Sequence, residues 1–454
     1  MNEMMTAAAY CIVGRNGSGK TLYVDCMRKR LASDRVRYVA FSDAYGASTD
    51  KAYYLQLRWN QHDIDQETPM VGELLERTFL LTGDDNPQRR RWQTQLYDLF
   101  QLDKLLDKYV ILLSSGELRK LQLAKTLLSN PAILILDNPF IGLDAQAREL
   151  LRDLLESLVR EQRITIYLIL AKSDDIPMFI DNIIEIDEHG NALPIMTRQE
   201  YLAAHGPIQR PVLSEEHRQA IVSLPEHQGL YHADTVIEMH HVCISYGNRT
   251  ILKNLDWTVR NGERWALAGQ NGSGKSTLLS LVCADNPQSY ACDIALFGHQ
   301  RGTGETIWEI KRHIGYVSPE MHRSYQRALP AVNVVASGLK DTVGLYVRPD
   351  EGEKAQCRWW MNIFGIGHLA DRNFISLSSG EQRLALLARA FVKDPELLIL
   401  DEPLHGLDLH NRQLARDVIN AFCERPGKTL IMVTHYEEEL PECITHRKYL
   451  EKHC

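Results

Sequence analysis

The stretch "GQNGSGKS", Gly269 to Ser276, decides the fold of the domain that contains it. It follows an apolar run, precedes a helix-forming run, and matches the pattern G-x-x-x-x-G-K-[ST] of a phosphate-binding loop. In such a loop the glycines let backbone N–H groups surround phosphate oxygens, and the N-terminus of the following helix favours negative charge. The stretch therefore predicts an α/β domain with a nucleotide phosphate site.

The chain repeats this pattern, with "GRNGSGKT" at Gly14 to Thr21. Residues 113–144 and 377–408 repeat as well, with 17 of 32 positions identical and no gap. A period of one whole domain indicates duplication rather than a solenoid. We therefore expect a first domain at residues 1–190, a linker at 191–234 and a second domain at 235–454.

The linker and the start of the first domain carry further expectations. The linker holds four prolines and is expected to contain one helix near "SEEHRQAIVSL". The second copy has about 35 residues before its loop and the first has only 13. The first domain is therefore expected to lack two or three strands, either because the sequence begins late or because this domain is trimmed.

Composition narrows the class of protein. Hydrophobic residues make up 44% of the 454 residues, and no apolar run approaches the ~18 residues of a membrane span. The chain therefore cannot be a permease by itself, and its start reads as a strand rather than a signal peptide. Nine cysteines with no CxxC spacing argue against zinc or iron–sulfur sites and suit the cytoplasm.

Charge gives no strong signal for nucleic acid. The formal net charge is −8, which provides no global basic surface. The densest basic run is "QRRRW", Gln88 to Trp92, and we interpret it as a solvated helix end rather than a phosphate-binding patch.

The two loops predict ATP and Mg²⁺ as ligands. The lysines should reach the β- and γ-phosphates, and the Ser or Thr that follows each lysine should hold Mg²⁺. Phosphate contacts are expected from Gly14, Asn16, Gly17, Ser18, Gly19, Lys20 and Thr21, and from Gly269, Asn271, Gly272, Ser273, Gly274, Lys275 and Ser276. Each repeat also has an apolar run that ends in an acid, Asp137 or Asp401, which we expect beside the metal together with Thr21 or Ser276.

"LSSGE", present at 113–117 and 377–381, precedes each of these runs by about 20 residues and resembles the signature motif of ABC-type ATPases. The resemblance implies an α/β fold of two tandem ABC-type P-loop domains. Each would have a mainly parallel sheet core, a helical subdomain and an antiparallel β subdomain, trimmed in the first. In this family two domains pair head to tail, so Ser114 and Gly116 would complete the site of Lys275, and Ser378 and Gly380 the site of Lys20. Pairing within one chain implies a monomer.

Two further features follow the family pattern. The "GLD" ending in Asp144 and in Asp408 is similar to the D-loop of ABC ATPases. Tyr246 stands where the family places an aromatic that stacks on adenine, although an ordinary buried tyrosine is the alternative. The first repeat has no counterpart of Tyr246.

The repeats differ where the family carries out hydrolysis. "LLILDEPLHGLD" has Glu402 after its acid, whereas "ILILDNPFIGLD" has Asn138. In the family this residue orients or deprotonates water, and an amide cannot accept the proton. His435 fits the switch histidine, and alignment of "DDIP" with "EELP" places Ala171 at that position. We expect one turnover site, with Glu402, His435 and Lys275 catalytic, and one holding site.

Both repeats depart from the family at the Q-loop, which normally senses a transport partner. Pro319 or Glu320 stands where glutamine is expected, and the first repeat offers only Asp43. Ordinary coupling to a permease is therefore in doubt. Glu117 and Glu381 replace the usual glutamine of the signature, which is a milder change.

The second half, with "RGTGETIWEIKRHIGYVS" at 301–318 and "PECITHR" at 441–447, resembles the ModF-like, or PhrA-like, family of bacterial double-ABC ATPases. Members have a fuller first domain and a longer C-terminal tail, which implies a shortened sequence here. The family is linked by name to molybdate uptake. The resemblance implies an ATPase component of a transport system, partnered by a membrane permease and peripheral to the inner membrane.

Two other functions remain open. One is a soluble ABC ATPase that acts on ribosomes or DNA, although the ribosome-acting members carry a long charged helical linker that is missing here. The other is a nucleotide switch with negligible turnover, against which Glu402 and His435 argue. Co-purification with membranes, or with ribosomes and nucleic acid, would separate the first two functions.

Overall fold

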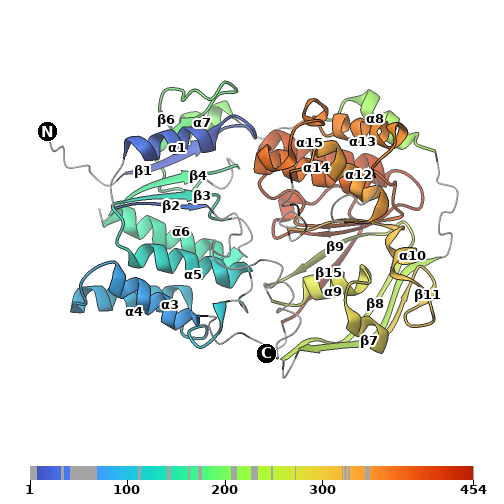
Figure 1. The fold of residues 1–454 in the computed structure, drawn as a ribbon, viewed down its shortest axis with the longest axis horizontal. Helices are drawn as coiled ribbons and strands as arrows, with labels where there is room; N and C mark the ends of the chain where they lie inside the picture. The colour runs from blue at the N-terminus through green and yellow to red at the C-terminus, as the bar shows by residue number, and fades with distance from the viewer. Residues whose placement is uncertain are drawn as a thin grey trace. The chain divides into compact units, whose positions relative to one another are not determined.

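The computed structural model describes residues 8–31, 35–40, 69–110, 113, 115–140, 145–161, 164–171, 176–205, 212–225, 234–246, 249–270, 272–319, 321, 325, 328–342 and 348–452. The chain divides into two compact units, Met1–Gly206 and Pro207–Cys454, called unit 1 and unit 2 below. Figure 1 shows the ribbon coloured along the chain.

Unit 1 is built on one mainly parallel sheet. Its strands, in spatial order, are β2 (Val36–Ala40), β3 (Ile133–Asp137), β4 (Thr165–Ile169), β1 (Ala9–Val13), β5 (Asn182–Glu185) and β6 (Met196–Thr197). Only β6 runs antiparallel, against β5. The helices are α1 (Lys20–Arg30), α3 (Val71–Leu81), α4 (Pro87–Phe100), α5 (Ser115–Leu128), α6 (Ala145–Arg160) and α7 (Arg198–Ala204).

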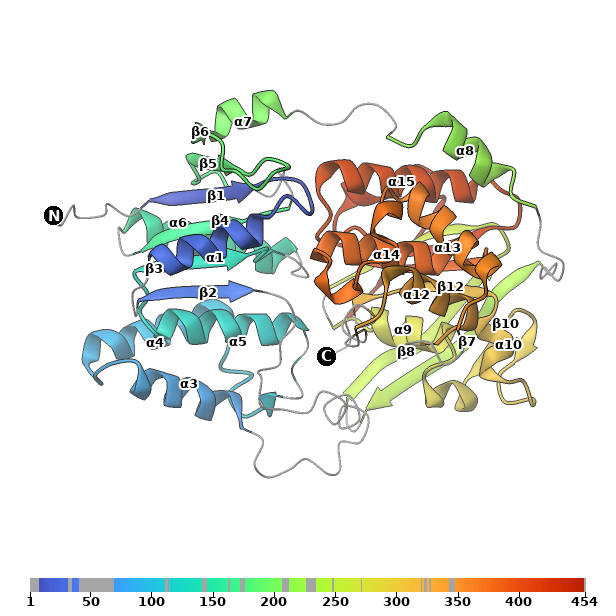
Figure 2. The same ribbon diagram turned by 45° about the horizontal axis from the view of Figure 1, so that its top comes forward.

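The two faces of this sheet bury different helices. On one face, α3, α4, α5 and α6 pack against alternate strand residues such as Cys11 and Leu134. On the other face, Val24 of α1 packs against Ile12 and Ile135. Figure 1 shows α1 above these strands and α5 and α6 below them, and Figure 2 shows α1 in front of the strands. Because strands covered on both faces are apolar throughout, β3 reads as one continuous hydrophobic run.

Unit 2 has a parallel and an antiparallel sheet. The parallel sheet has the order β12 (Ile314–Val317), β13 (Leu397–Asp401), β14 (Thr429–Val433), β9 (Arg264–Gly269) and β15 (His446–Leu450). The antiparallel sheet has the order β11 (His299–Gln300), β10 (Asp293–Leu296), β7 (Thr235–Tyr246) and β8 (Arg249–Arg260). The helices are α8 (Glu215–Val222), α9 (Lys275–Val282), α10 (Ile307–Lys311), α12 (Ala331–Ala336), α13 (Glu351–Ile363), α14 (Ser379–Phe391) and α15 (Leu409–Cys423).

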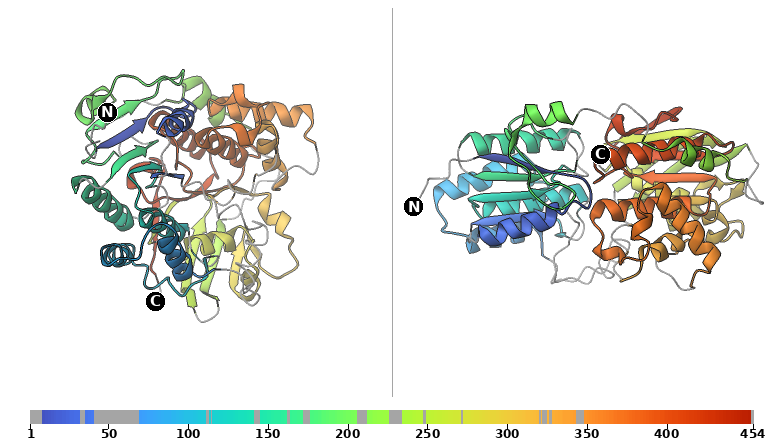
Figure 3. Two further views of the ribbon diagram at one scale, coloured as in Figure 1. Left: turned by 60° about the vertical axis from the view of Figure 1, so that its left-hand side comes forward. Right: turned by 90° about the horizontal axis from the view of Figure 1, so that it is seen from above.

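The parallel sheet of unit 2 also separates two cores. The antiparallel sheet and α9 share one core with residues such as Ile399 and Ile431. The four helices α12 to α15 share the other core with residues such as Leu398 and Leu430. Figure 1 shows these helices above β9 and β15 and the antiparallel strands β7 and β8 below them, and the left view of Figure 3 shows the same separation. The expected sheet core, helical subdomain and β subdomain are therefore all present in unit 2.

The two parallel sheets have the same strand order. In unit 1, β1 precedes the glycine loop and lies between β4 and β5. In unit 2, β9 precedes the glycine loop and lies between β14 and β15. The described part of unit 1 contains no counterpart of the antiparallel sheet formed by β7, β8 and β10. The expected fold class, two tandem α/β domains with mainly parallel sheet cores, is confirmed.

The segment expected to be a linker contains two helices. The helix α8 confirms the one expected near "SEEHRQAIVSL", and Asp417 of α15 accepts hydrogen bonds from the N–H groups of Val212 and Leu213 just before it. Sequence analysis missed α7, although the capping box of Thr197 and Glu200 at its start is a recognisable signal. The helix α7 belongs to unit 1 and α8 to unit 2.

The basic run "QRRRW" lies in the first turns of α4, and one of its arginines is paired with two acids. Arg90 pairs with Glu76 at 2.8 Å and with Asp85 at 2.6 Å. Arg89 donates to the backbone oxygen of Phe79, and both guanidinium groups lie 4.2 Å from the centre of the Phe79 ring. Two of the three arginines therefore stabilise the helical hairpin of α3 and α4.

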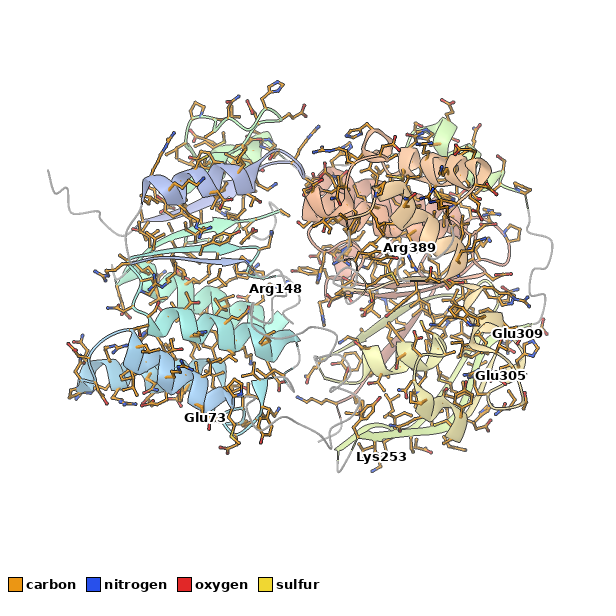
Figure 4. The ribbon with its side chains drawn as sticks, viewed as in Figure 1. Glu73, Arg148, Lys253, Glu305, Glu309 and Arg389 are labelled. Atoms are coloured by element: carbon orange, nitrogen blue, oxygen red, sulfur yellow. The ribbon has the colours of Figure 1, made fainter. Side chains whose placement is uncertain are left out.

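Glutamates and an arginine fix local structure elsewhere (Figure 4). Glu73 and Glu309 accept backbone hydrogen bonds at the starts of α3 and α10. Glu305 accepts hydrogen bonds from the N–H groups of Gly302 and Thr303 and holds that turn closed. Arg389 of α14 donates to the backbone oxygen of Thr342 from within the helical core.

None of the helices in the described ranges is both long enough and apolar enough to cross a membrane.

Gly315 on β12 tests the packing of α14 on the parallel sheet. A Cβ at this position would lie 2.3 Å from the backbone oxygen of Ala390 and 2.7 Å from Pro395 Cγ. We expect Gly315→Ala to destabilise unit 2 by roughly 1–3 kcal/mol, which is typical of an overpacked core. Differential scanning calorimetry should show a lower transition temperature for unit 2.

The matched control is Gly352→Ala on α13, where the only close atom is Asp350 Oδ1 at 3.3 Å. Alanine in a helix is favoured over glycine by about 1 kcal/mol, so this transition should stay or rise. Equal melting of Gly315→Ala and wild type would show that β12 does not pack on α14 as described.

Candidate functional site

The two glycine loops have closely matching backbone geometry. Gly14 has a φ of 153° and Gly269 a φ of 152°, at the ends of β1 and β9. A Cβ on either glycine would lie 2.6 Å from a backbone oxygen of the neighbouring strand or bridge, at Ile186 or Leu450. Only glycine fits there, so the loop can turn directly from the strand into α1 or α9.

The lysine of each loop is folded over its own loop. Lys20 Nζ donates to the backbone oxygens of Gly14 and Arg15, at 2.6 and 2.7 Å. Lys275 Nζ donates to those of Gly269 and Gln270, at 2.7 and 3.1 Å. Each ammonium group is therefore held at the loop, at the N-terminus of the helix that follows it.

Other loop residues also match between the units. Ser18 and Ser273 are both buried, and their hydroxyl oxygens have no hydrogen-bond partner within the described residues. Thr21 and Ser276 lie one residue into their helices and are exposed. Buried hydroxyl groups and exposed helix-start hydroxyls beside a lysine suit the phosphates and the metal of a nucleotide. Asn271 lies outside the described residues. The other expected loop residues, Asn16, Gly17, Gly19, Gly272 and Gly274, are described and lie in their loops.

The parallel register brings the acidic strand ends to the same edge as the loops. Asp137 pairs across the sheet with Ile169, and Asp401 with Val433. Because carboxyl ends of parallel strands meet at one sheet edge, both acids lie at the edge from which the glycine loops leave. The expected grouping of loop and acid is thus present in each unit.

Register also tests the alignment of the switch histidine. Ile169 and Val433 occupy equivalent places, and each is followed two residues later by Ala171 or His435. Ala171 therefore stands at the position of His435, as the sequence alignment predicts.

In unit 2, Glu402 is held by two histidines. His435 Nε2 lies 3.1 Å from Glu402 Oε1, and His405 Nδ1 lies 2.8 Å from Glu402 Oε2. Burial works to raise the pKa of the Glu402 carboxyl, but the charges and hydrogen bonds of the two histidines outweigh it and hold this pKa well below its usual range. Glu402 is therefore poised as a carboxylate. The part played by His405 was not predicted from the sequence, where the only signal was a titratable residue three positions after the glutamate.

In unit 1, the amide of Asn138 is tied up by its neighbours. Its Nδ2 donates to Asp137 Oδ1 at 2.7 Å, and its Oδ1 accepts from the N–H of Ala171 at 3.0 Å. Asn138 and Glu402 share the left-handed backbone conformation, with φ values of 50° and 49°. The two residues therefore start from the same backbone geometry and differ in the chemistry of the side chain.

Asp137 has a further partner in Tyr38 of β2, whose hydroxyl donates to Oδ2 at 3.0 Å. Burial raises the pKa of Asp137, although the hydrogen bonds from Tyr38 and Asn138 and the charge of Lys20 oppose this. Both carboxylate oxygens of this expected metal ligand accept hydrogen bonds from protein donors.

Comparison with known proteins decides the family. The profile of the ABC transporter family matches residues 3–141 and 252–405. The chain belongs to this family. It is 38% identical to the ABC transporter ATP-binding protein ModF of Escherichia coli (strain K12), over 97% of this chain and 90% of that protein. It is 28% identical to an uncharacterized ABC transporter ATP-binding protein of Schizosaccharomyces pombe, over 99% and 93%.

Solved structures agree on the fold. A chain in a model of ribosome-bound archaeal Pelota and ABCE1 has a TM-score of 0.61 at 19% identity, over 94% of this chain and 70% of that chain. The RNase-L inhibitor has a TM-score of 0.53 at 17% identity. The chain is an ATP-binding protein of the double-ABC type, and the resemblance to ModF-like proteins is confirmed.

The signature segments of this ABC protein begin helices. Ser378 is the N-cap of α14, and its side chain and that of Glu381 form a reciprocal capping box. Glu381, which departs from the usual glutamine, therefore has a structural role. Gly380 lies in the first turn of α14 and Gly116 in that of α5, whereas Ser114 lies outside the described residues. Glu117 pairs with Lys108 at 3.0 Å.

The other family positions are partly described. Asp408, at the end of "GLD", caps α15 by accepting a hydrogen bond from the N–H of Asn411 at 2.8 Å. Tyr246 ends β7, is partly buried, and accepts a hydrogen bond from Asn286 Nδ2 at 3.0 Å. Stacking of its ring on adenine stays a prediction. Asp43, Asp144 and Glu320 lie outside the described residues, and Pro319 lies two residues after the end of β12.

Equivalent loops predict equal loss of nucleotide when either lysine is removed. We expect Lys20→Ala and Lys275→Ala each to reduce bound ATP from two molecules per chain to one, because the ammonium group supplies the positive charge that faces the phosphates. Equilibrium dialysis with a slowly hydrolysed ATP analogue measures the stoichiometry. Lys354→Ala, which removes a half-buried lysine paired with Glu351 on α13, is the control and should keep two. Two molecules bound by Lys20→Ala would show that binding of nucleotide in unit 1 does not depend on Lys20.

Proposed function

We propose that this chain is an ATPase with one competent site, in unit 2, and one nucleotide-holding site, in unit 1. The observation that supports this most is the contrast at one sheet position. Glu402 offers a buried carboxylate between two histidines, whereas Asn138 offers an amide already hydrogen-bonded to Asp137 and Ala171. A carboxylate can take the proton of an attacking water, and an amide cannot.

In unit 2 the proposed roles follow from position. Glu402 is the general base, and its lowered pKa keeps it ionised. His435, at the end of the neighbouring strand β14, orients one oxygen of that carboxylate. Lys275 and the N-terminus of α9 stabilise the negative charge of the phosphates. Mg²⁺ held by Ser276 and Asp401 would add positive charge at the same phosphates when bound.

In unit 1 the same loop holds ATP without turnover. Lys20 and the start of α1 repeat the phosphate cradle of unit 2. Thr21 and Asp137 are the corresponding metal-binding residues. No group at the position of Asn138 or Ala171 accepts a proton, so the step that depends on a base is missing. Loss of a positioned base typically slows a reaction by ~10²–10⁴-fold.

We further propose that the ATPase is a cytoplasmic component of a transport system and binds a membrane permease at the surface of the inner membrane. The support is the 38% identity to the ABC transporter ATP-binding protein ModF over nearly the whole of both chains, together with the sequence resemblance to a family linked by name to molybdate uptake. The lack of the Q-loop glutamine, with Pro319 or Glu320 where it is expected, favours a second candidate, in which the ATPase acts on ribosomes or DNA.

The site assignment is tested by steady-state phosphate release. We expect Glu402→Gln to lower kcat by at least ~10²-fold, because the amide cannot act as a base. Asn138→Glu should change kcat little, because Ala171 supplies no imidazole to hold the new carboxylate. Bound ATP should stay at two per chain in both variants.

Substantial activity in Glu402→Gln would show that the base assignment is wrong. A large gain in Asn138→Glu would show instead that unit 1 needs only a carboxylate to turn over.

To separate the two partner classes, the tagged chain is recovered from gently lysed cells on a sucrose gradient. Recovery with membranes, sensitive to loss of the permease, supports transport, whereas recovery with ribosomes or nucleic acid supports the second candidate.

A further inference from the structure

His405 lies on the turn that follows β13, three residues after Glu402. Its side chain is buried, with 3% of its surface exposed, and its Nδ1 lies 2.8 Å from Glu402 Oε2. The backbone closes the same turn, since the N–H of His405 donates to the carbonyl oxygen of Glu402 at 3.4 Å and that of Leu407 to Leu404 at 3.2 Å. The imidazole and the carboxylate therefore belong to one closed turn.

The two oxygens of Glu402 have separate partners from separate elements. His435 arrives from the end of β14 and faces Oε1, whereas His405 shares the turn of Glu402 and faces Oε2. One contact alone would leave the carboxylate free to rotate about its last side-chain bond. Two contacts, one at each oxygen, define the plane of the carboxylate and so the direction of its remaining lone pairs.

The second ring nitrogen of His405 indicates whether packing alone explains this histidine. Its Nε2 is buried and has no hydrogen-bond partner among the described residues. The ring lies edge-on to Tyr436, with 5.9 Å between ring centroids and 85° between planes. A buried nitrogen without a partner costs stability, so a histidine here is poorly explained by packing.

The two units of this chain differ at all three positions of the group. Unit 2 has Glu402, His405 and His435, and the sequence of unit 1 has Asn138, Ile141 and Ala171 at the matching places. Ile141 lies outside the described residues. A histidine four positions after the acid that ends the strand is thus found in unit 2, which also has the carboxylate of Glu402.

We propose that His405 is a positioning residue for ATP hydrolysis, which holds Oε2 of Glu402 so that the carboxylate is aligned for the attacking water. This rests on the proposed function, in which Glu402 is the base. His405 does not contact the substrate, and it acts through the orientation of Glu402. The predicted signature is a loss of kcat without a matching loss of ATP binding.

The test compares two variants of His405 in the full chain. His405→Leu keeps a buried apolar side chain of similar size and removes the donor. His405→Asn keeps an N–H donor on Cγ, where the imidazole carries Nδ1. We expect His405→Leu to lower kcat by about 10-fold to 100-fold with the KM for ATP nearly unchanged, since small misplacements of a catalytic group cost this much. His405→Asn should recover most of the lost kcat.

His313 provides a matched control. It is a buried histidine whose Nδ1 lies 3.2 Å from Glu396 Oε1, at the opposite end of β13. His313→Leu removes a comparable histidine–glutamate pair, so it should lower the melting temperature and leave kcat within about 2-fold of wild type. Melting curves and ATP-binding stoichiometry of all variants show that each is folded.

The outcomes separate this inference from the proposed function. If Glu402→Gln abolishes turnover and His405→Leu keeps the wild-type kcat, or changes only KM, the positioning role is wrong and the base assignment survives. If His405→Asn is as slow as His405→Leu, the hydrogen bond to Oε2 is not the cause. If Glu402→Gln itself remains active, the proposed function fails, and the role of His405 fails with it.

Discussion

Parallel pairing of three strands is the constraint on which both sites depend. In unit 2, β14 pairs with β13 on one side and with β9 on the other, all in the same direction. The glycine loop, Glu402 and His435 are therefore brought to one edge of the sheet, although their positions in the chain are far apart. In unit 1, β4 lies between β3 and β1 in the same way. A shift of register at β14 or at β4 would separate the phosphate loop of that unit from its acid.

On this shared scaffold, the difference between the units is one of hydrogen-bond chemistry. In unit 2 a carboxylate is surrounded by imidazoles, and its ionised form is favoured even though it is buried. In unit 1 an amide fills the same backbone position and spends both its ends on Asp137 and on the backbone of Ala171. The amide therefore donates a hydrogen bond to Asp137, which an ionised carboxylate at this position could not do because it has no N–H group.

Much of this fold could be predicted from the sequence, because its strongest signals are local. The glycine loops, the acid-ended apolar runs and the repeat of 17 identical positions point to α/β domains. The alignment of Ala171 with His435 also followed from short flanking motifs. The role of His405 could not be predicted, since its contact with Oε2 depends on the closed turn. The same holds for Tyr38, which reaches Asp137 only through the pairing of β2 with β3. The helix α7 was missed because its short apolar pattern is weak, although its cap is clear.

A single-turnover measurement tests the central claim, the asymmetry of the two sites, most directly. The chain is loaded with two molecules of labelled ATP, and hydrolysis is started with Mg²⁺ together with an excess of unlabelled ATP. The reaction is then quenched in acid, and the labelled phosphate is separated from the labelled ATP. We predict that the labelled phosphate released in the fast phase equals half of the labelled ATP bound, with the other half recovered as ATP. Release of both labelled phosphates in the fast phase would contradict the account, because unit 1 would then hydrolyse ATP without a carboxylate at Asn138.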